Sequence, residues 1–222
     1  MRNPGQNNVL DVAALHERTL KSVEEIQRQE RTRDWIELMR KKDLFGAQLP
    51  DLGAPDGLET LSALIKTLSS GQRIVVSIFS DLLQHISKES LILFDEPEIY
   101  LHPTLLSTLL RMLHELLGQY DSYAIVATHS PIVIQEIPAR SVRVFEREGS
   151  VPSLAPLPIE SFGENLTELV DHVFRMNEDD KNYKTQLRTL LEKRSYEEIL
   201  ALFGGRLSLN ARMYLLSLQE KE

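Results

Sequence analysis

Residues Leu91–Pro97 read LILFDEP, a run of four apolar residues that ends in two acids and a proline. A continuous apolar run of this length predicts a strand that is buried on both faces of a parallel sheet. Pro97 ends the strand, because proline cannot donate to the ladder of hydrogen bonds. Asp95 and Glu96 therefore lie at the carboxyl end of the strand, which is where open α/β sheets bind their ligands.

Outward from this strand, the next apolar segments predict a helix and a second strand. Leucine and methionine recur at helical spacing after Pro103, a residue suited to a first helical turn, and Gly118 closes that helix. The run Tyr123–Ala127 predicts a second buried strand, which ends at Thr128 and His129. Strand, helix and strand make a βαβ unit, with its loops on one edge of the sheet.

The rest of the chain is expected to be mostly helical. Roughly helical spacing predicts a helix over residues 9–44, and the wholly polar stretch 27–34 within it favours an exposed arm. Ser141–Glu146 alternates like a third strand. The expected fold class is α/β, with a partial parallel sheet flanked by helices, an N-terminal helical arm and C-terminal helices. The predicted domains are residues 1–57, the arm and a loop; 58–158, the α/β core; and 159–222, the C-terminal helical region.

Composition excludes several classes of protein. The net charge of −8 argues against a protein coated with DNA-binding charge. The chain has no cysteine, so it has neither a disulfide framework nor a thiolate metal site. No apolar run reaches the roughly 20 residues that a membrane helix needs. We expect a cytoplasmic protein with no membrane partner.

The paired acids suit nucleotide hydrolysis. One carboxylate, which we assign to Asp95, would hold Mg²⁺, an ion that prefers oxygen ligands and bridges phosphates. The other, Glu96, would orient the attacking water and help to deprotonate it. The alternative is an ordinary solvent-facing strand end, where both residue types are common, and the pair alone does not decide between the two.

Two further groups have both a functional and a structural interpretation. His129 can donate to a γ-phosphate and position a water, or it can simply be satisfied by a backbone group. Leu68–Gln72, LSSGQ, is a turn of small residues before an apolar helix, and such a turn presents N–H groups to an anion. Ser69 could bind phosphate there or serve as an ordinary helix cap. Taken singly, the structural interpretation is favoured for each group.

Together, in this order, the motifs resemble the C-terminal half of ABC-type ATPase heads. These P-loop NTPases include transporter ATPases, SMC-like proteins and the OLD-like AAA proteins of bacteria. LSSGQ is similar to the signature loop, LILFDEP to Walker B, and ATHSP at 127–131 to the switch-histidine loop. Glu98–Pro103, within EPEIYLHP, stands where the D-loop lies, and its wording is nearer to the OLD-like and SMC-like groups than to transporters. The resemblance covers residues 60–145.

The resemblance implies an ATP hydrolase with ATP and Mg²⁺ as cofactors and an ABC-type core. In this family two heads sandwich two nucleotides, and the signature loop of one head touches the γ-phosphate held by the P-loop of the other. The implied site residues are catalytic Glu96 and His129, the metal ligand Asp95, and the signature residues Ser69, Ser70, Gly71 and Gln72, which would bind nucleotide in trans. Ser70 stands where many relatives have glycine, and its small size should be tolerated.

The sequence departs from the family in one larger respect. None of its ten glycines is followed by lysine, so the G-K-[ST] triplet of a P-loop is absent. We therefore expect a fragment, a split gene product or one half of a composite head. A P-loop-bearing polypeptide or a second ATPase head would complete it as a homodimer or heterodimer. Without the P-loop strand, which in the family pairs beside the Walker B strand, an apolar sheet edge is left open.

The leading hypothesis is an OLD-like or SMC-like ATPase subunit whose ATP-driven dimerisation gates a DNA-directed or nuclease activity. DNA repair and phage defence use such ATPases, including Septu-type pairs of an ATPase with an HNH nuclease partner. One rival is a non-hydrolysing scaffold or dimer partner, and another is a transporter ATPase subunit, which the D-loop wording disfavours. Basic residues in 9–44 could contact DNA, but interleaved acids favour a solvated, self-paired helix.

Overall fold

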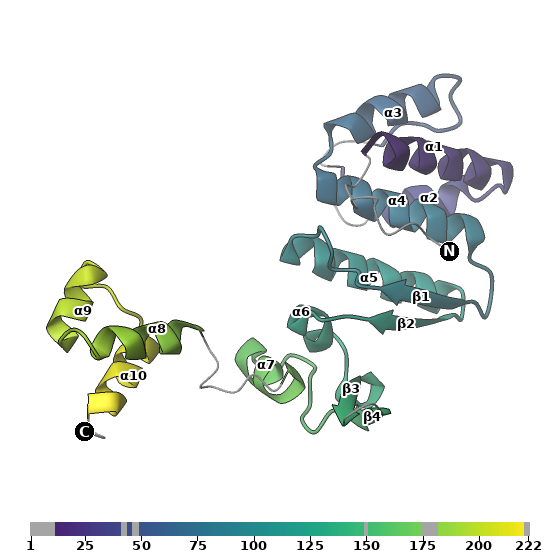
Figure 1. The fold of residues 1–222 in the computed structure, drawn as a ribbon. Coiled ribbons are helices and arrows are strands. Elements are labelled where there is room, and N and C mark those ends of the chain that lie inside the picture. The colour runs from purple at the N-terminus through teal and green to yellow at the C-terminus, as the bar shows by residue number, and fades with distance from the viewer. Residues whose placement is uncertain (1–11, 41–43, 46–48, 149–150, 175–181, 220–222) are drawn as a thin grey trace. The chain divides into compact units, whose positions relative to one another are not determined.

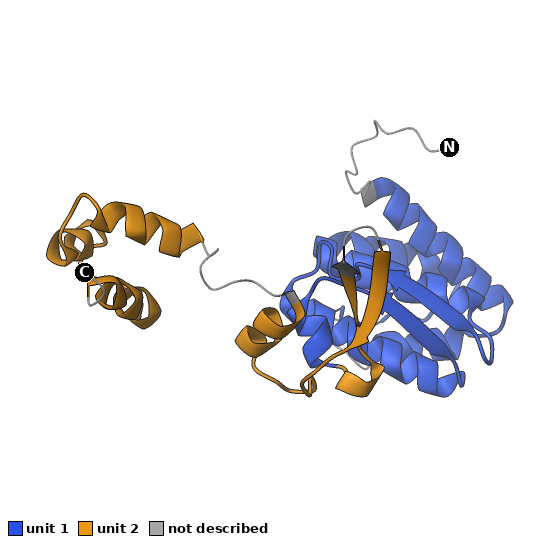
Figure 2. Ribbon diagram, turned by 60° about the horizontal axis from the view of Figure 1, so that its bottom comes forward, with its two compact units in different colours: residues 1–136 blue, residues 137–222 orange. Residues whose placement is uncertain are grey.

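The computed structural model describes residues 12–40, 44–45, 49–148, 151–174 and 182–219. The chain divides into two compact units, residues 1–136 and residues 137–222 (Figure 2). Figure 1 labels the helices and strands of both units.

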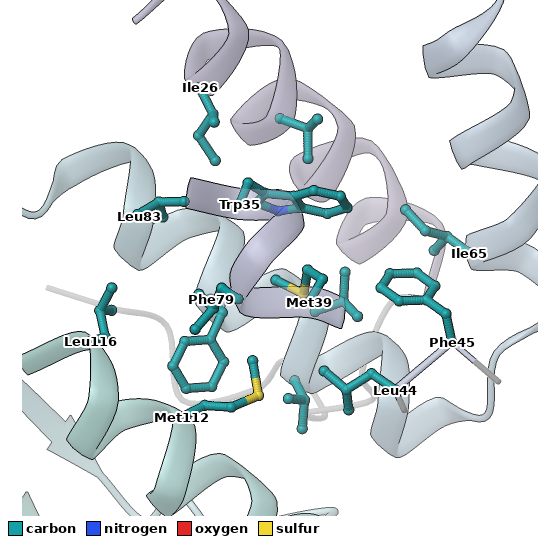
Figure 3. Close-up of a cluster of buried hydrophobic side chains, with 14 of the residues drawn as sticks. Ile26, Trp35, Met39, Leu44, Phe45, Ile65, Phe79, Leu83, Met112 and Leu116 are labelled. Atoms are coloured by element: carbon teal, nitrogen blue, oxygen red, sulfur yellow. The ribbon is translucent and has the colours of Figure 1, made fainter. Parts of the chain in front are cut away.

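The described residues before β1 (Leu91–Asp95) form four helices. Their bounds are α1 Val12–Arg28, α2 Thr32–Arg40, α3 Gly57–Thr67 and α4 Ser70–His85. α1 packs along α4 and also contacts α2 and α3. Val23 and Ile26 of α1 and Trp35 of α2 have no exposed surface. The expectation of an exposed N-terminal arm is therefore wrong, because these helices form part of the main hydrophobic core (Figure 3).

The N-terminal segment is two helices rather than one, which explains why the expectation of an exposed arm is wrong. The chain turns between them at Glu30, whose φ of 61° lies in the left-handed region. The polar stretch that suggested an exposed arm is this turn with the adjoining helix ends, so two short apolar seams face one core. Within that core the Trp35 indole N–H donates to Ser80 Oγ at 2.8 Å, and the Trp35 and Phe45 rings lie 6.2 Å apart.

The predicted βαβ unit is present. β1 Leu91–Asp95 is followed by α5 Pro103–Gln119 and β2 Tyr123–Ala127. The strands pair in parallel from Leu91 opposite Tyr123 to Asp95 opposite Ala127, so their carboxyl ends meet at one edge. A short helix, α6 Pro131–Gln135, comes directly after the second strand.

The two strands differ from the prediction in their burial, which alternates along each strand. Ile92, Phe94, Ala124 and Val126 pack against the core formed with the helices. The opposite face carries Leu91, Leu93, Tyr123 and Ile125, which are 60%, 73%, 69% and 61% exposed. Burial on both faces is therefore wrong for this chain. Both faces are apolar in sequence, but the described residues of the first unit cover only one of them.

The described residues of the second unit form a short 3₁₀ helix, η1 Ala139–Ser141, then a hairpin and four α-helices. Their bounds are β3 Arg143–Glu148, β4 Val151–Pro156, α7 Leu166–Phe174, α8 Asn182–Leu191, α9 Tyr196–Leu202 and α10 Leu209–Gln219. The expected third strand is thus β3, and it pairs with β4 in an antiparallel, two-stranded sheet. Leu187 of α8, Ile199 of α9 and Leu215 of α10 form a separate small core. The predicted domain limits at residues 57 and 158 stay predictions.

One carboxylate organises the start of the second unit. Glu160 Oε1 accepts backbone N–H bonds from Ala139 at 2.9 Å, Ser161 at 2.9 Å and Phe162 at 3.0 Å. Ser161 Oγ donates in turn to the Ile137 carbonyl at 2.5 Å. Segments about twenty residues apart are thereby joined. Among the helices described in either unit, none has the length and apolar character of a bilayer-spanning segment.

Candidate functional site

The candidate site lies where β1 and β2 end. Pairing continues one residue beyond the strands, because the Glu96 N–H donates to the Ala127 carbonyl at 2.8 Å. Asp95 and Glu96 therefore lie beside the loop that carries Thr128 and His129. The parallel pairing brings together residues that are more than thirty positions apart, as the sequence predicts.

The backbone at Glu96 has an unusual conformation. Its φ of 48° lies in the left-handed region, where residues other than glycine are uncommon. Tyr100, further along the same turn, has a φ of 69°. The Ile99 N–H donates to the Glu96 carbonyl at 3.1 Å and closes the turn. Strained non-glycine residues of this kind concentrate at functional sites, because the surrounding structure must hold them in place.

The turn places the Glu96 carboxylate against His129. His129 Nε2 lies 3.1 Å from Glu96 Oε1. The Glu96 side chain is 26% exposed and the His129 side chain is 83% exposed, so the pair faces solvent mainly through the histidine. The two residues predicted to be catalytic are therefore in direct contact.

A third carboxylate at this edge, Glu98, was not assigned a role from sequence. Glu98 Oε1 accepts a hydrogen bond from Thr128 Oγ1 at 2.5 Å and from the His129 backbone N–H at 2.9 Å. The signal available in sequence was the spacing Glu-Pro-Glu, in which the second acid follows the first by two residues. That spacing does not reveal that the turn aims both carboxylates at the same loop.

The pKa values of the two glutamates at this edge are shifted in opposite directions. Burial raises the pKa of Glu96 above its ordinary value of 4.5, and the neighbouring Glu98 raises it further, while His129 opposes both. Burial also acts to raise the pKa of Glu98, but the hydrogen bonds from Thr128, its own backbone N–H and His129 hold it below the ordinary value. Glu98 is therefore the carboxylate that stays ionised, and Glu96 is the one whose proton affinity is increased. A raised pKa suits a general base, because proton transfer is most effective when the pKa approaches the working pH.

The acids fit a nucleotide-bound Mg²⁺ better than a metal held by protein alone. Among the described residues, no group of three or more His, Cys, Asp or Glu side chains could hold a metal ion. Mg²⁺ at phosphate sites takes only one or two carboxylates and completes its shell with phosphate oxygens and water. Asp95 is exposed at the strand end, so its oxygens are open to such a shell.

The signature-like residues lie at the start of α4 and act there as a helix cap. Ser69 Oγ accepts the Gln72 N–H at 3.3 Å, and Gln72 Oε1 accepts the Ser69 N–H at 2.9 Å, which is a capping box. Gln72 Nε2 also donates to the Leu44 carbonyl at 2.7 Å. The structural interpretation of Ser69 is therefore present in the fold, and Ser70 is exposed on the first turn.

Gly71 connects this cap with the segment after the acids. A Cβ at Gly71 would lie 2.7 Å from Leu105 Cδ1 and 3.8 Å from the Tyr100 carbonyl oxygen. The start of α4 thus packs on the loop that leads from Glu98 into α5. The structure brings Asp95, Glu96 and His129 together as one group, and the signature-like residues form a second group beside that loop.

Comparison with known proteins places this geometry in a family. A family described as "AAA domain, putative AbiEii toxin, Type IV TA system" matches residues 12–135, which is more than half of the chain. The match runs from α1 to α6 and includes both groups of candidate residues. The chain belongs to this family of AAA-type ATPase domains.

A curated relative is similar to more than two thirds of the chain. Protein ea59 of Escherichia phage lambda is 37% identical to it over 158 residues, which are 71% of this chain and 30% of the relative. The chain therefore spans less than a third of the length of that relative. The name of the relative states no activity.

Proposed function

We propose that this chain supplies the Walker B acids and the switch histidine of an ATP-hydrolysing site. The observation that carries the proposal is the 3.1 Å contact between Glu96 Oε1 and His129 Nε2 at the carboxyl edge of a parallel sheet. Membership of an AAA-type ATPase family supports the same reaction. This edge of an α/β sheet is where ligands are expected.

Each residue of the group has a proposed role. Glu96 accepts a proton from the attacking water, and its raised pKa suits that transfer. His129 orients Glu96 and donates toward the oxygen of the γ-phosphate. Asp95 holds Mg²⁺, which when bound would neutralise phosphate charge and polarise the phosphoryl group.

The phosphate cradle would come from outside the residues seen here. No glycine–lysine pair exists in the sequence, so a P-loop must be provided by another polypeptide or another segment. The exposed apolar face of β1 and β2 supports this view, because such a face in a complete domain is covered by a further layer. In the assembled state the nucleotide of a second head would be contacted by Ser69, Gly71 and Gln72.

The biological use proposed for this site is gating. ATP closes a dimer of heads and hydrolysis reopens it, which would control a DNA-directed or nuclease partner. The support is the EPEIYLHP wording, which is nearer to OLD-like and SMC-like ATPases than to transporters. A defence role of the Septu type is the finer form of this proposal.

Calorimetry with ATP and Mg²⁺ tests the proposal. The purified chain is titrated alone and then together with each polypeptide encoded beside it that contains a P-loop. We expect no binding by the chain alone, and binding with turnover once a P-loop is supplied. Tight binding by the chain alone would refute the need for an external cradle. Absence of binding in every combination would favour a non-hydrolysing scaffold.

A further inference from the structure

We propose that Glu98 is a positioning residue that holds His129 against Glu96. Its carboxylate ties the turn after β1 to the loop after β2. The inference rests on the proposed function of the Glu96–His129 pair, but the contacts that carry it belong to Glu98 alone. Glu98 itself is not assigned to the reacting atoms.

The first observation is that one oxygen of Glu98 receives two donors from one loop. Oε1 accepts the Thr128 hydroxyl at 2.5 Å and the His129 backbone N–H at 2.9 Å. Hydrogen bonds to an ionised acceptor are the stronger kind, and the pKa of Glu98 lies below its ordinary value, so the carboxylate is ionised near neutral pH. The Glu98 carboxylate thus fixes the backbone of His129, the residue whose ring contacts Glu96.

The second observation is that His129 has few other means of being held. Its side chain is 83% exposed, so packing does not determine where the ring lies. A side-chain contact that is largely open to solvent is too weak to fix two side chains by itself. The 3.1 Å approach to Glu96 therefore depends on a backbone that is already in place.

The third observation is that the same carboxylate fixes the start of α6. Thr128 Oγ1, which donates to Glu98, also accepts the Ser130 N–H at 2.9 Å. Ser130 is the residue that precedes α6, and Val133 and Ile134 of that helix are buried. The loop is held by strand pairing at Ala127 and by α6 beyond it, and Glu98 fixes the three residues between them.

The chemistry of the contact selects the test variants. Glu98→Gln keeps a side-chain oxygen of the same reach, so it can still accept both donors. Glu98→Ala removes the acceptor and leaves the two donors without it. Glu59→Ala, on the exposed surface of α3, is the matched control for loss of a glutamate side chain.

The experiment measures amide hydrogen exchange and side-chain couplings of the full chain by NMR. In Glu98→Ala we expect the His129 amide to exchange at least about tenfold faster, which is the usual consequence of losing a hydrogen bond to a charged group. We also expect the His129 side chain to average over its rotamers. Glu98→Gln should restore both quantities to within about threefold of the wild type, and exchange at Val76 and Phe79 in α4 should be unchanged in all variants.

Two results would overturn the inference: unchanged His129 exchange and rotamers in Glu98→Ala, or a Gln variant that behaves like the Ala variant. If Glu98→Ala does not fold, Thr128→Val is the second variant: it removes the Thr128 donor to Glu98 and keeps the His129 N–H bond, so we expect the His129 side chain to loosen in part, and unchanged rotamers would overturn the inference. These measurements need no nucleotide, so they test the role of Glu98 even if the chain proves to have no part in ATP hydrolysis. In an active assembly, Glu98→Ala should lower kcat with little change in nucleotide Kd, and Glu98→Gln should lower it less, because it keeps the acceptor for the loop but not the charge that adds to burial in raising the pKa of Glu96.

Discussion

Glu96 combines three properties that are seldom found in one residue. Its backbone is in the left-handed region, its side chain touches His129, and its pKa is raised by burial and by Glu98. Glu96 has little freedom to leave its position, because its amide donates to the Ala127 carbonyl and its carbonyl accepts the Ile99 N–H. The geometry is thus prepared before any ligand arrives.

Replacing Glu96 by Gln tests this residue in an assembly that turns over ATP. Glutamine keeps the size of the side chain but cannot accept the proton of the attacking water, so kcat should fall by about 10²–10⁴. ATP binding should persist and the closed dimer should accumulate, which can be followed by size-exclusion chromatography with light scattering. Turnover equal to that of the wild type would remove Glu96 from the role of base.

A second carboxylate gives a prediction for pH. The backbone N–H of Phe162 and then that of Ala139 hold the pKa of Glu160 below its ordinary value of 4.5, with Ser161 adding to them. A pKa that is depressed on folding stabilises the folded state fully above the unfolded value, and this stabilisation is lost as the pH falls through the folded value. Unfolding of the wild type should therefore become easier below about pH 4.5 more steeply than unfolding of Glu160→Gln.

Thermal unfolding between neutral pH and pH 3 measures this difference. The matched control is Glu197→Gln, an exposed carboxylate in the first turn of α9. If Glu160→Gln and the wild type lose stability in parallel as the pH falls, the three N–H bonds do not depend on the charge of Glu160.

The sequence locates most of these residues because strand ends can be read from it. Asp95, Glu96 and His129 follow apolar runs, and parallel pairing then brings them to one edge. Glu98 could not be found in this way. Its role depends on a turn with left-handed residues at Glu96 and Tyr100, and neither residue type signals that conformation.

At the scale of elements, the start of α4 has one observed role, as a helix cap, and one proposed role, in binding nucleotide. The Ser69 hydroxyl caps the helix. In the proposed function it also binds a phosphate of the nucleotide held by a second head. A serine hydroxyl can donate to a phosphate while it accepts from the Gln72 N–H, so the two roles are compatible in one conformation. The capping box would then hold the donor ready for the second head.

Two substitutions of Ser69 separate these roles. Ser69→Ala removes the cap and should lower the free energy of unfolding by about 1 kcal/mol. Ser69→Asp keeps an equally good cap but adds a negative charge, so stability should be retained while nucleotide-dependent association is lost. Denaturant unfolding and light scattering with ATP measure the two effects. Association of the Asp variant at wild-type strength would argue that Ser69 is a cap and nothing more.

The helices before α4 show where prediction from sequence stops. Helical spacing identifies the segment as helical, but the polar stretch 27–34 looks the same whether it is exposed along one helix or forms the turn between two. Long-range contacts decide which of the two structures forms. Arg31 donates to the Ile86 carbonyl at 3.2 Å and to the Tyr120 hydroxyl at 2.7 Å, contacts that no local pattern reveals. These bonds hold the start of α2 against the βαβ unit.

At the scale of the first unit, the uncovered sheet face is the main feature that the fold leaves open. Leu93 and Ile125 lie opposite each other in the register and are both largely exposed. Monomeric proteins seldom leave a contiguous apolar surface of this kind, and such surfaces usually mark a binding interface. The strand prediction was correct in type and position, but burial depends on a layer that the local sequence cannot describe.

The double variant Leu93→Ser with Ile125→Ser tests this surface. Because both side chains are exposed, each change should alter the free energy of unfolding by no more than about 0.5 kcal/mol. Binding of the proposed P-loop polypeptide should weaken at least about tenfold, which corresponds to about 1.4 kcal/mol, as measured by calorimetry. Ile92→Ser, on the inner face of the same strand, is the contrast and should destabilise the fold. Unweakened binding by the double variant would place the partner elsewhere.

The same exposed face has a consequence for the abundance of the protein in a cell. Chaperones and proteases act on apolar surface that stays exposed, so a chain made without its cover is a substrate for removal. Its abundance should then follow that of the covering polypeptide, and gene dosage of one would set the level of both. Quantitative immunoblots of cells with and without the P-loop polypeptide would show this coupling, and the Leu93 and Ile125 double variant should escape it.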